Sequence, residues 1–497
     1  MSSQPHVGLD EETAASLAQR ALQTGDEAQA LPTVRAAAER LRRPVLWQWT
    51  ALLERSLDEH QAALNSFAEA ARLAPDDFTI AHGRAHTAME AGLDAVALFE
   101  AARALAPHNG AVLIGLAAAE AAVGRGETGA ERLRDALQGS PMWIRGHEQL
   151  AQLLSTLGRG AEATQSIEQA IARLPREPRL WEALLNLELR RGNYELLRAI
   201  IDRARAAGVE MPDFRIYEAI HAAEHDSEIY PDALFGPASR AFDDVLDTWR
   251  VRHLLRLGEP AAALPILDRA LGGPRSAELW TYAATAWRMV EDRREEWLTG
   301  QPGLVQVTDL KPSLPALDDL AEFLRILHRA RGEYLDQSVR GGTQTDGPLF
   351  SRIDPLVRQV RDAVVSAVDD YVRQLPPIDA KHPMLARRRD RATRFSGSWS
   401  VRLRSGGKHS NHVHPQGWIS SALYIALPAR TSGEREDAGW FTIGDPDERL
   451  GIDIGPSRTI EPVPGRLVLF PSYLWHGTVP FREGERLTIA FDVRPPS

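Results

Sequence analysis

The sequence predicts a multidomain protein, in which an all-α superhelix of two-helix repeats precedes an α+β domain of jelly-roll type. Helix-ending segments recur at nearly constant spacing through the N-terminal half. After Pro376 the apolar pattern changes from a helical period to a period of two, and short strands alternate with turns rich in Gly, Pro and Asp. The 497 residues also exceed what one hydrophobic core normally supports.

The composition narrows the possible chemistry. Hydrophobic residues make up 43% and charged residues 25% of the chain, as in ordinary globular proteins. The formal net charge of −10 makes nucleic acid a poor candidate partner. Cysteine is absent, which excludes disulfides, thiolate catalysis, thiolate zinc sites and iron–sulfur clusters. Any metal must therefore be held by His, Asp or Glu.

No apolar run approaches the roughly 18–20 residues that cross a bilayer. Met1–Glu12 lacks the basic and apolar regions of a secretory signal. We therefore expect a cytoplasmic protein without a membrane partner.

Four prolines mark the repeats, because each follows a helix that ends in small and apolar residues. At nearly constant spacing they close the segments Ser66–Pro75, Phe99–Pro107, Arg132–Pro141 and Ser166–Pro175. This spacing resembles the roughly 34-residue tetratricopeptide repeat, in which proline closes the second helix. Each such unit has an apolar face that it can bury only by stacking on its neighbours.

The first helix of each unit fits the same period. Two leucines and a glycine recur one period later, as Leu150, Leu153 and Gly158 and then as Leu184, Leu187 and Gly192. The repeats are clear over 17–208, with degenerate copies at Trp249–Leu271 and Ala277–Trp297. We assign residues 1–300 to the repeat array. Arrays of this type commonly bind peptides or proteins along a concave face, so a peptide or protein substrate is the expected partner.

The pattern changes near residue 300. Residues 301–320 are assigned to a linker because Lys311–Pro315 disfavours a helix. Residues 321–497 form the predicted second domain. It begins with helices at Leu317–Tyr334 and Ile353–Leu375, joined by the polar, glycine-rich Gly341–Gly347. The expected strands are Gly397–Arg404, Trp418–Leu427, Gly439–Ile443, Leu467–Phe470 and Arg486–Val493.

Histidines concentrate in this second domain. His409, His412 and His414 lie within Lys408–Pro415, and His412 and His414 would point to the same side of an extended strand. His476 follows much later in the chain, beyond another predicted strand. Two ligands from one strand end and a third from a distant strand can form one face of an octahedral metal site. The remaining positions would stay open for a chelating cosubstrate and O₂.

Arg486 follows His476 closely in the sequence, and Thr488 shares its strand face. A guanidinium and a hydroxyl that point into a barrel can bind the remote carboxylate of a ligand that also chelates the metal. 2-Oxoglutarate has that shape. Tyr424 could supply a third hydrogen bond to the same carboxylate.

From about Gln337 to Arg494 the chain resembles the 2-oxoglutarate/Fe(II) oxygenase family that is often fused to tetratricopeptide repeats. The resemblance implies a double-stranded β-helix in which His412 and His476 bind Fe(II). It further implies that Arg486, Thr488 and Tyr424 contact 2-oxoglutarate. O₂-dependent hydroxylation of a substrate C–H would then yield succinate and CO₂, with no catalytic side chain beyond the metal site. The resemblance rests on Gly341–Gly347, Ser396–Arg404, Asn411–Tyr424, Pro464–Thr478 and Arg486–Asp492.

The sequence departs from the usual motif of the wider oxygenase superfamily at one position. The usual first motif is His-x-Asp or His-x-Glu, and here His414 takes the second place. We prefer a site of three histidines, His412, His414 and His476. A site with two histidines and a water, and a site completed by Asp445 or Asp453, remain open. A neutral third ligand would leave the iron more positive and could weaken metal retention.

Several residues near these motifs are candidates for the substrate pocket. Tryptophans could form a wall around the reactive centre, although barrel packing is the alternative. Asn411 and Gln416 could orient the imidazoles. The candidate tryptophans are Trp399, Trp418 and Trp475.

Two other functions compete with the oxygenase. One is a non-catalytic repeat scaffold with a degenerate metal-binding barrel. The other is a three-histidine dioxygenase that does not use 2-oxoglutarate. The substitution Arg486→Ala discriminates the second alternative, because it should raise the 2-oxoglutarate requirement steeply only if Arg486 binds that cosubstrate.

Overall fold

The computed structural model describes residues 9–225, 244–273, 275–335 and 337–496. Residues 1–8 of the presumed non-signal N-terminus and residues 226–243 of the expected repeat array lie outside the described part. The chain forms two compact units, one of residues 1–133, 346–362 and 496–497 and one of residues 134–345 and 363–495. These units divide the chain differently from the predicted boundaries at 300 and 320, which remain sequence predictions.

The first unit contains antiparallel helix pairs. Its glycines let neighbouring helices approach closely: a Cβ placed on Gly83 would lie 2.7 Å from Phe67, and one on Gly115 would lie 2.2 Å from Phe99. Both members of this contact recur one repeat later, so the packing follows the repeat. The helices are α1 Glu11–Thr24, α2 Glu27–Leu41, α3 Pro44–Ser56, α4 His60–Leu73, α5 Phe78–Glu90, α6 Val96–Leu105, α7 Gly110–Ala122 and α8 Gly126–Gly139, which continues into the second unit.

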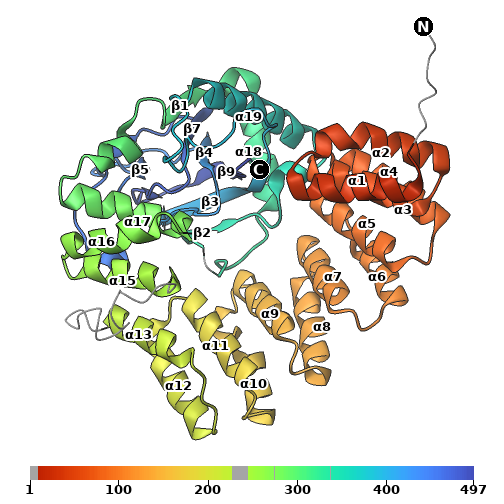
Figure 1. Cartoon of the computed structure of the whole chain (residues 1–497), viewed down its shortest axis with the longest axis horizontal. Coiled ribbons are helices and arrows are strands. Elements are labelled where there is room, and N and C mark those ends of the chain that lie inside the picture. Colours follow the sequence, from red (N-terminus) through yellow and green to blue (C-terminus); the bar gives the residue numbers. More distant parts are fainter. Residues whose placement is uncertain (1–8, 226–243, 274, 336, 497) are drawn as a thin grey trace. The chain divides into compact units, whose positions relative to one another are not determined.

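The second unit begins with further helix pairs, which Figure 1 shows as successive hairpins. Leu180, Trp181 and Leu184 of α11 lie in one continuous buried cluster with residues of α10, α12 and α13. The predicted helical repeat region is thereby confirmed. None of the described helices is both long and apolar enough to span a bilayer. The helices are α9 Ile144–Thr156, α10 Gln165–Arg173, α11 Pro178–Arg190, α12 Leu197–Ala206, α13 Phe214–His225, α15 Asp244–Arg256, α16 Pro260–Ala270 and α17 Ser276–Met289, with short η1 Gly160–Glu162 and η2 Tyr194–Leu196.

The segment expected as a linker contributes to the β-sheet. After a single π-helical turn, η3 (Glu296–Gly300), strand β1 (Gln306–Asp309) pairs antiparallel with β7 (Arg466–Pro471). The following helix α18 covers Leu317–Leu327, shorter than predicted. It ends early because the backbone N–H groups of Arg331 and Gly332 donate to the carbonyl of Thr156 on α9 instead of continuing the helix.

The glycine-rich connection was also interpreted incorrectly. Val339–Gln344 forms strand β2, which pairs antiparallel with β3 (Phe395–His409) through a bulge. Gly341 has φ 68°, and a Cβ at this position would lie 3.0 Å from Gly407. Glycine and polar side chains hide the alternating pattern of a strand, so composition alone suggested a loop. The second predicted helix forms as α19 (Pro355–Gln374).

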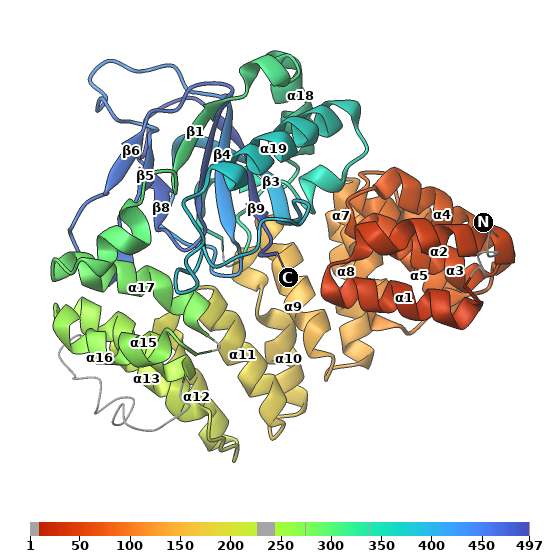
Figure 2. The ribbon, with the colours of Figure 1, turned by 45° about the horizontal axis from the view of Figure 1, so that its top comes forward.

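The strands form two antiparallel sheets, as Figure 2 shows. The larger has the order β1-β7-β4-β9-β3-β2 and the smaller the order β6-β5-β8. Helical repeats followed by antiparallel β-sheets confirm the predicted fold class. All five predicted strands are present, whereas β6 and β8 were not predicted because each is very short. The remaining strands are β4 Ile419–Ala426, β5 Phe441–Ile443, β6 Arg458–Ile460, β8 His476–Thr478 and β9 Arg486–Val493.

Candidate metal centre and cosubstrate pocket

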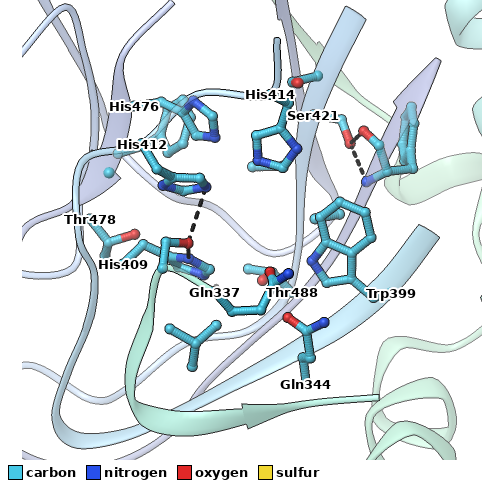
Figure 3. Close-up of a pocket in the computed structure, with 18 of the residues that line it drawn as sticks. Gln337, Gln344, Trp399, His409, His412, His414, Ser421, His476, Thr478 and Thr488 are labelled. Atoms are coloured by element: carbon cyan, nitrogen blue, oxygen red, sulfur yellow. Dashed lines mark hydrogen bonds between the residues drawn. The ribbon is translucent and has the colours of Figure 1, made fainter. Parts of the chain in front are cut away.

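Three imidazoles converge between the two sheets (Figure 3). His412 follows β3 and forms an isolated bridge with His476, the first residue of β8, through two N–O hydrogen bonds of 3.0 Å. His414 is held by its backbone N–H, which donates to the carbonyl of Ser472. The ring centre of His412 lies 4.1 Å from that of His476 and 5.0 Å from that of His414. One ring nitrogen from each histidine lies within 4.8 Å of the others, so the three could hold one metal ion.

Hydrogen bonds at Nδ1 orient all three rings alike. Nδ1 of His412 lies 2.7 Å from the carbonyl oxygen of Ser410, and Nδ1 of His476 lies 3.0 Å from that of Leu474. Nδ1 of His414 lies 2.5 Å from a carboxylate oxygen of Asp492. A backbone carbonyl can only accept, so Nδ1 carries the proton and the lone pair is on Nε2. The network therefore presents Nε2 of His412 and His476, and by the same logic of His414, as metal ligands.

Burial keeps the imidazoles of His412 and His476 neutral. It holds the pKa of His412 and of His476 well below the usual histidine range, and the neighbouring histidines lower both further. Burial likewise lowers the pKa of His409 to about 3. Neutral imidazole is the form that binds a metal, so at neutral pH His412 and His476 need no deprotonation before metal binding.

Ser338 links His409 to the cluster. Its Oγ lies 3.1 Å from Nδ1 of His409 and 3.1 Å from Nε2 of His412. The serine hydroxyl thus contacts the nitrogen that a metal would need. Metal binding to His412 requires Ser338 to turn away. The sequence analysis noted His409 without assigning it a role and did not identify Ser338, which lies far before His412 in the chain.

Asp492 is a site residue that the sequence analysis missed. Besides its contact with His414, its Oδ1 accepts a hydrogen bond of 2.6 Å from Ser420 on β4. The indole of Trp399 stacks on the other side of His414 at 5.7 Å with an interplanar angle of 3°. A signal was available, because Asp492 continues the alternate-residue face of β9 that includes Arg486 and Thr488.

The predicted cosubstrate residues lie close to one another. Arg486 and Tyr424 are buried, with 2% and 0% of their surface exposed, and the guanidinium carbon lies 5.1 Å from the tyrosine ring centre. Arg486 and Thr488 line the same cavity as the three histidines, whereas Tyr424 lies behind Arg486. Burial lowers the pKa of Arg486 and raises that of Tyr424.

Arg486 and Tyr424 interact with each other through their polar ends, yet two of their atoms lack a well-formed hydrogen bond. Within the described residues, neither Nε of Arg486 nor the hydroxyl of Tyr424 makes a hydrogen bond of normal geometry. A buried donor without an acceptor costs about 1–3 kcal/mol. A carboxylate that entered beside Arg486 would satisfy the guanidinium, so these residues fit the remote end of 2-oxoglutarate.

The carboxylates considered as alternative ligands do not join the cluster. Oδ2 of Asp445 accepts a hydrogen bond of 3.0 Å from Asn411. Among the described residues, the group that could hold a metal contains His412, His414 and His476, and neither Asp445 nor Asp453 belongs to it.

The proposed pocket residues have different surroundings. Trp399 and Asn411 face the region of the metal site, and Gln416 is exposed at its outer rim. Trp418 is buried, and its indole N–H donates to the carbonyl of Met384, so it packs in the core. The indole N–H of Trp475 donates to Thr285 on α17. Trp475 thus anchors the segment before His476 to the repeat helices.

Two cavities, an inner cavity and an outer cleft, adjoin each other at the histidines. The inner cavity, lined by the histidines and Arg486, has a volume of about 40 Å³. The outer cleft has a volume of about 910 Å³ and reaches the C-terminal end of α11. Both cavities share the lining residues Gln337, Ser338, Trp399, His412, His414 and Asp492.

Residues 397–492 match a family model described as "Putative 2OG-Fe(II) oxygenase". The C-terminal part of the chain is thus similar to "Putative 2OG-Fe(II) oxygenase" domains. The matched range contains the three clustered histidines, Tyr424, Arg486, Thr488 and Asp492. The predicted fusion of tetratricopeptide-type repeats with a 2OG-Fe(II) oxygenase domain is thereby confirmed.

Solved structures are similar to portions of the chain. MamA (41-end) from Desulfovibrio magneticus RS-1 is 20% identical, covers 32% of this chain and 93% of its own, and has a TM-score of 0.29. A tetratricopeptide repeat protein from Parabacteroides merdae ATCC 43184 is 16% identical over 44% of this chain and 86% of its own, with a TM-score of 0.32. A Pseudomonas putida prolyl-4-hydroxylase is 19% identical over 39% of this chain and 94% of its own, with a TM-score of 0.27. No curated protein matches.

Proposed function

We propose that the protein is an Fe(II)- and 2-oxoglutarate-dependent dioxygenase that hydroxylates a peptide or protein. One observation carries the proposal: a buried arginine with an unpaired Nε–H lies in the same cavity as three imidazoles that present Nε2. His412, His414 and His476 would hold the metal. Arg486 and Thr488 would bind the remote carboxylate of 2-oxoglutarate.

When bound, the iron would supply O₂ activation coupled to decarboxylation of 2-oxoglutarate, with succinate and CO₂ as coproducts. The chain's own residues bind and orient the cosubstrate and shield the site from water. Arg486 fixes the cosubstrate because a guanidinium matches a carboxylate with two parallel hydrogen bonds. Trp399 stacks on His414 at the boundary between inner cavity and outer cleft, where it limits water and keeps the imidazole plane in place.

Anaerobic titration of the Fe(II) protein with 2-oxoglutarate tests this assignment. A visible metal-to-ligand charge-transfer band is expected, because the 2-oxo acid chelates the metal. Glutarate is the matched control: it has the same length and charges but lacks the 2-oxo group, so it should give no band. Bound iron without a band would favour a three-histidine dioxygenase that uses no 2-oxoglutarate. Failure to bind iron would favour the non-catalytic scaffold.

The outer cleft supports a polypeptide substrate. Small-molecule sites are mostly apolar and bury most of the ligand. This cleft is instead open and lined by charged and polar groups, among them Arg190, Arg191, Arg340, Glu333 and Asp447. An extended polypeptide, with a backbone amide at every residue, suits such a surface. We place the proposed peptide site in this cleft beside α11, whereas the sequence suggested the concave face of the repeats.

Arg449 and Tyr194 connect the two walls of the cleft. Arg449 follows β5, and its guanidinium donates a hydrogen bond of 3.1 Å to the hydroxyl of Tyr194 in η2. Both residues line the outer cleft, and neither lines the inner cavity. A peptide bound there would contact them without disturbing the metal.

A pooled peptide library incubated with Fe(II), 2-oxoglutarate and O₂ tests the substrate class. Mass spectrometry should detect peptides that gain one oxygen atom. Arg449→Glu should reduce this hydroxylation while the anaerobic 2-oxoglutarate band keeps its midpoint. Arg458→Glu, an exposed arginine on β6, serves as the control. A parent protein that decarboxylates 2-oxoglutarate and yet oxidises no peptide pool would contradict a polypeptide substrate and leave the oxygenase assignment intact.

A further inference from the structure

The histidine cluster has one asymmetry. Nδ1 of His412 and of His476 each contacts a neutral backbone carbonyl, whereas Nδ1 of His414 contacts the carboxylate of Asp492 at 2.5 Å. His414 is also the residue that replaces the usual carboxylate ligand. The position at which the usual motif has a carboxylate is thus occupied by a histidine that contacts an anionic partner.

We infer that Asp492 acts through His414 as the negative charge of the metal centre and so takes over the electrostatic role of the missing carboxylate ligand. Asp492 is a positioning residue, since it touches the imidazole and not the metal. The inference rests on the proposed function, because it requires that the three histidines bind a divalent metal.

The carboxylate of Asp492 is buried and held in place by hydrogen bonds. Only 8% of Asp492 is exposed, and Ser420 donates to its second oxygen at 2.6 Å. Within the described part of the chain, one basic side chain, that of His414, lies within 4.0 Å of the Asp492 carboxylate. Both carboxylate oxygens are therefore engaged, one by a hydroxyl that fixes the group and one by the imidazole.

This arrangement has two physical consequences. A carboxylate that accepts the Nδ1–H bond makes Nε2 a stronger donor to the metal and fixes the ring orientation. It also balances charge, because a divalent metal with three neutral imidazoles carries two positive charges and Asp492 reduces this to one. A His₂-carboxylate site has the same net charge. Trp399, stacked parallel to His414, leaves the imidazole little freedom to turn away.

Metal affinity measured on the full chain tests the inference without turnover. Co(II) is the probe, since its visible spectrum reports the ligands directly. Asp492→Asn keeps the shape: its amide oxygen can accept from His414 and its amide NH2 can donate to the hydroxyl of Ser420, so the charge is removed with both contacts in place. The Co(II) dissociation constant should rise about 10–100-fold, with a shift of the visible bands. Asp437→Asn, which removes a carboxylate paired with exposed Arg435, should leave both unchanged.

The substitution Asp492→Asn, made in a His414→Asp variant, distinguishes an effect of charge from an effect on local structure. In His414→Asp the carboxylate ligand is restored, and Asp492 then faces a second anion. Adding Asp492→Asn to this variant should strengthen Co(II) binding or leave it unchanged, which reverses the sign of the effect. Equal weakening in both backgrounds would mean that Asp492 merely supports the local structure and would overturn the inference.

Two further outcomes are decisive. If His414→Asp does not fold, the Co(II) spectrum of Asp492→Asn decides alone: a band shift with an unchanged melting temperature of the metal-free protein supports the inference, and an unshifted spectrum overturns it. A parent protein that binds metal and forms the 2-oxoglutarate band while Asp492→Asn binds Co(II) equally well would refute only this inference. A parent that binds no metal would refute the proposed function itself.

Discussion

The guanidinium carbon of Arg486 lies 5.1 Å from the ring centre of Tyr424, and neither Nε of Arg486 nor the tyrosine hydroxyl has a hydrogen-bond partner of normal geometry within the described residues. A buried cation beside a hydroxyl that lacks a well-formed hydrogen bond indicates a binding site for an anionic ligand. The two residues come from adjacent strands, because Tyr424 on β4 pairs with Thr488 on β9. The pair therefore defines the inner end of the cosubstrate pocket.

Arg486→Ala should weaken 2-oxoglutarate binding about 10- to 150-fold, since a charge-assisted hydrogen bond contributes about 1.5–3 kcal/mol. The midpoint of the anaerobic Fe(II) titration measures this. The midpoint for Arg486→Lys should lie between those of the parent and the alanine variant, because lysine keeps the charge and loses the paired hydrogen bonds. An unchanged midpoint in Arg486→Ala would refute its assignment to the cosubstrate.

Ser338→Ala should strengthen metal binding. The serine hydroxyl contacts Nε2 of His412 at 3.1 Å, and this contact must break before the nitrogen can bind a metal. Its removal should lower the Co(II) dissociation constant by about 2- to 10-fold, the equivalent of one ordinary hydrogen bond of about 0.5–1.5 kcal/mol. Weaker binding in this variant would instead indicate that Ser338 holds His412 in a productive orientation.

Gly477→Ala should damage the metal site, because an added Cβ would lie 2.0 Å from Oδ1 of Asn411. Asn411 cannot move freely, since its amide nitrogen donates to Asp445 and to the carbonyl of Pro446 at 3.0 Å. The melting temperature and Co(II) affinity should both fall. Asn411→Ala added to Gly477→Ala should recover part of both losses, and a double variant no better than Gly477→Ala would contradict the steric explanation.

His328 should make the protein sensitive to acid. Burial lowers the pKa of His328 from its ordinary 6.5 to about 4 in the folded state. The unfolded chain therefore binds this proton first as pH falls. The contribution of neutral His328 to the free energy of unfolding is fully present above about pH 6.5. It is lost as pH falls from 6.5 toward 4, and the loss is at most roughly 3 kcal/mol.

His328→Gln should reduce that pH dependence, because glutamine can hydrogen-bond to Thr343 and Ser400 without a titrating group. Melting temperatures measured between pH 4 and 6.5 should fall less steeply than in the parent. His108→Gln, at an exposed position, is the control. Parallel curves for the parent and His328→Gln would refute the assignment.

The sequence by itself determined the features that repeat along the chain or alternate within one strand. The regular spacing of the prolines predicted the helical repeats, and the period-two pattern of Arg486–Val493 predicted β9 with the bounds observed. Arg486 was identifiable because its strand face follows from that alternation. These signals are local, since they depend on which face of a helix or strand is buried.

The tertiary structure decided which distant residues meet. Asp492 reaches His414 and Ser338 reaches His412 across long stretches of chain, contacts that no periodicity encodes. It also decided that α18 ends at Leu327, after which Arg331 and Gly332 donate to the carbonyl of Thr156, and that β2 forms from a glycine-rich segment. The physical reason is that a side chain's partner and a backbone group's hydrogen bond are chosen through space, after the sheets and repeats have brought those groups together.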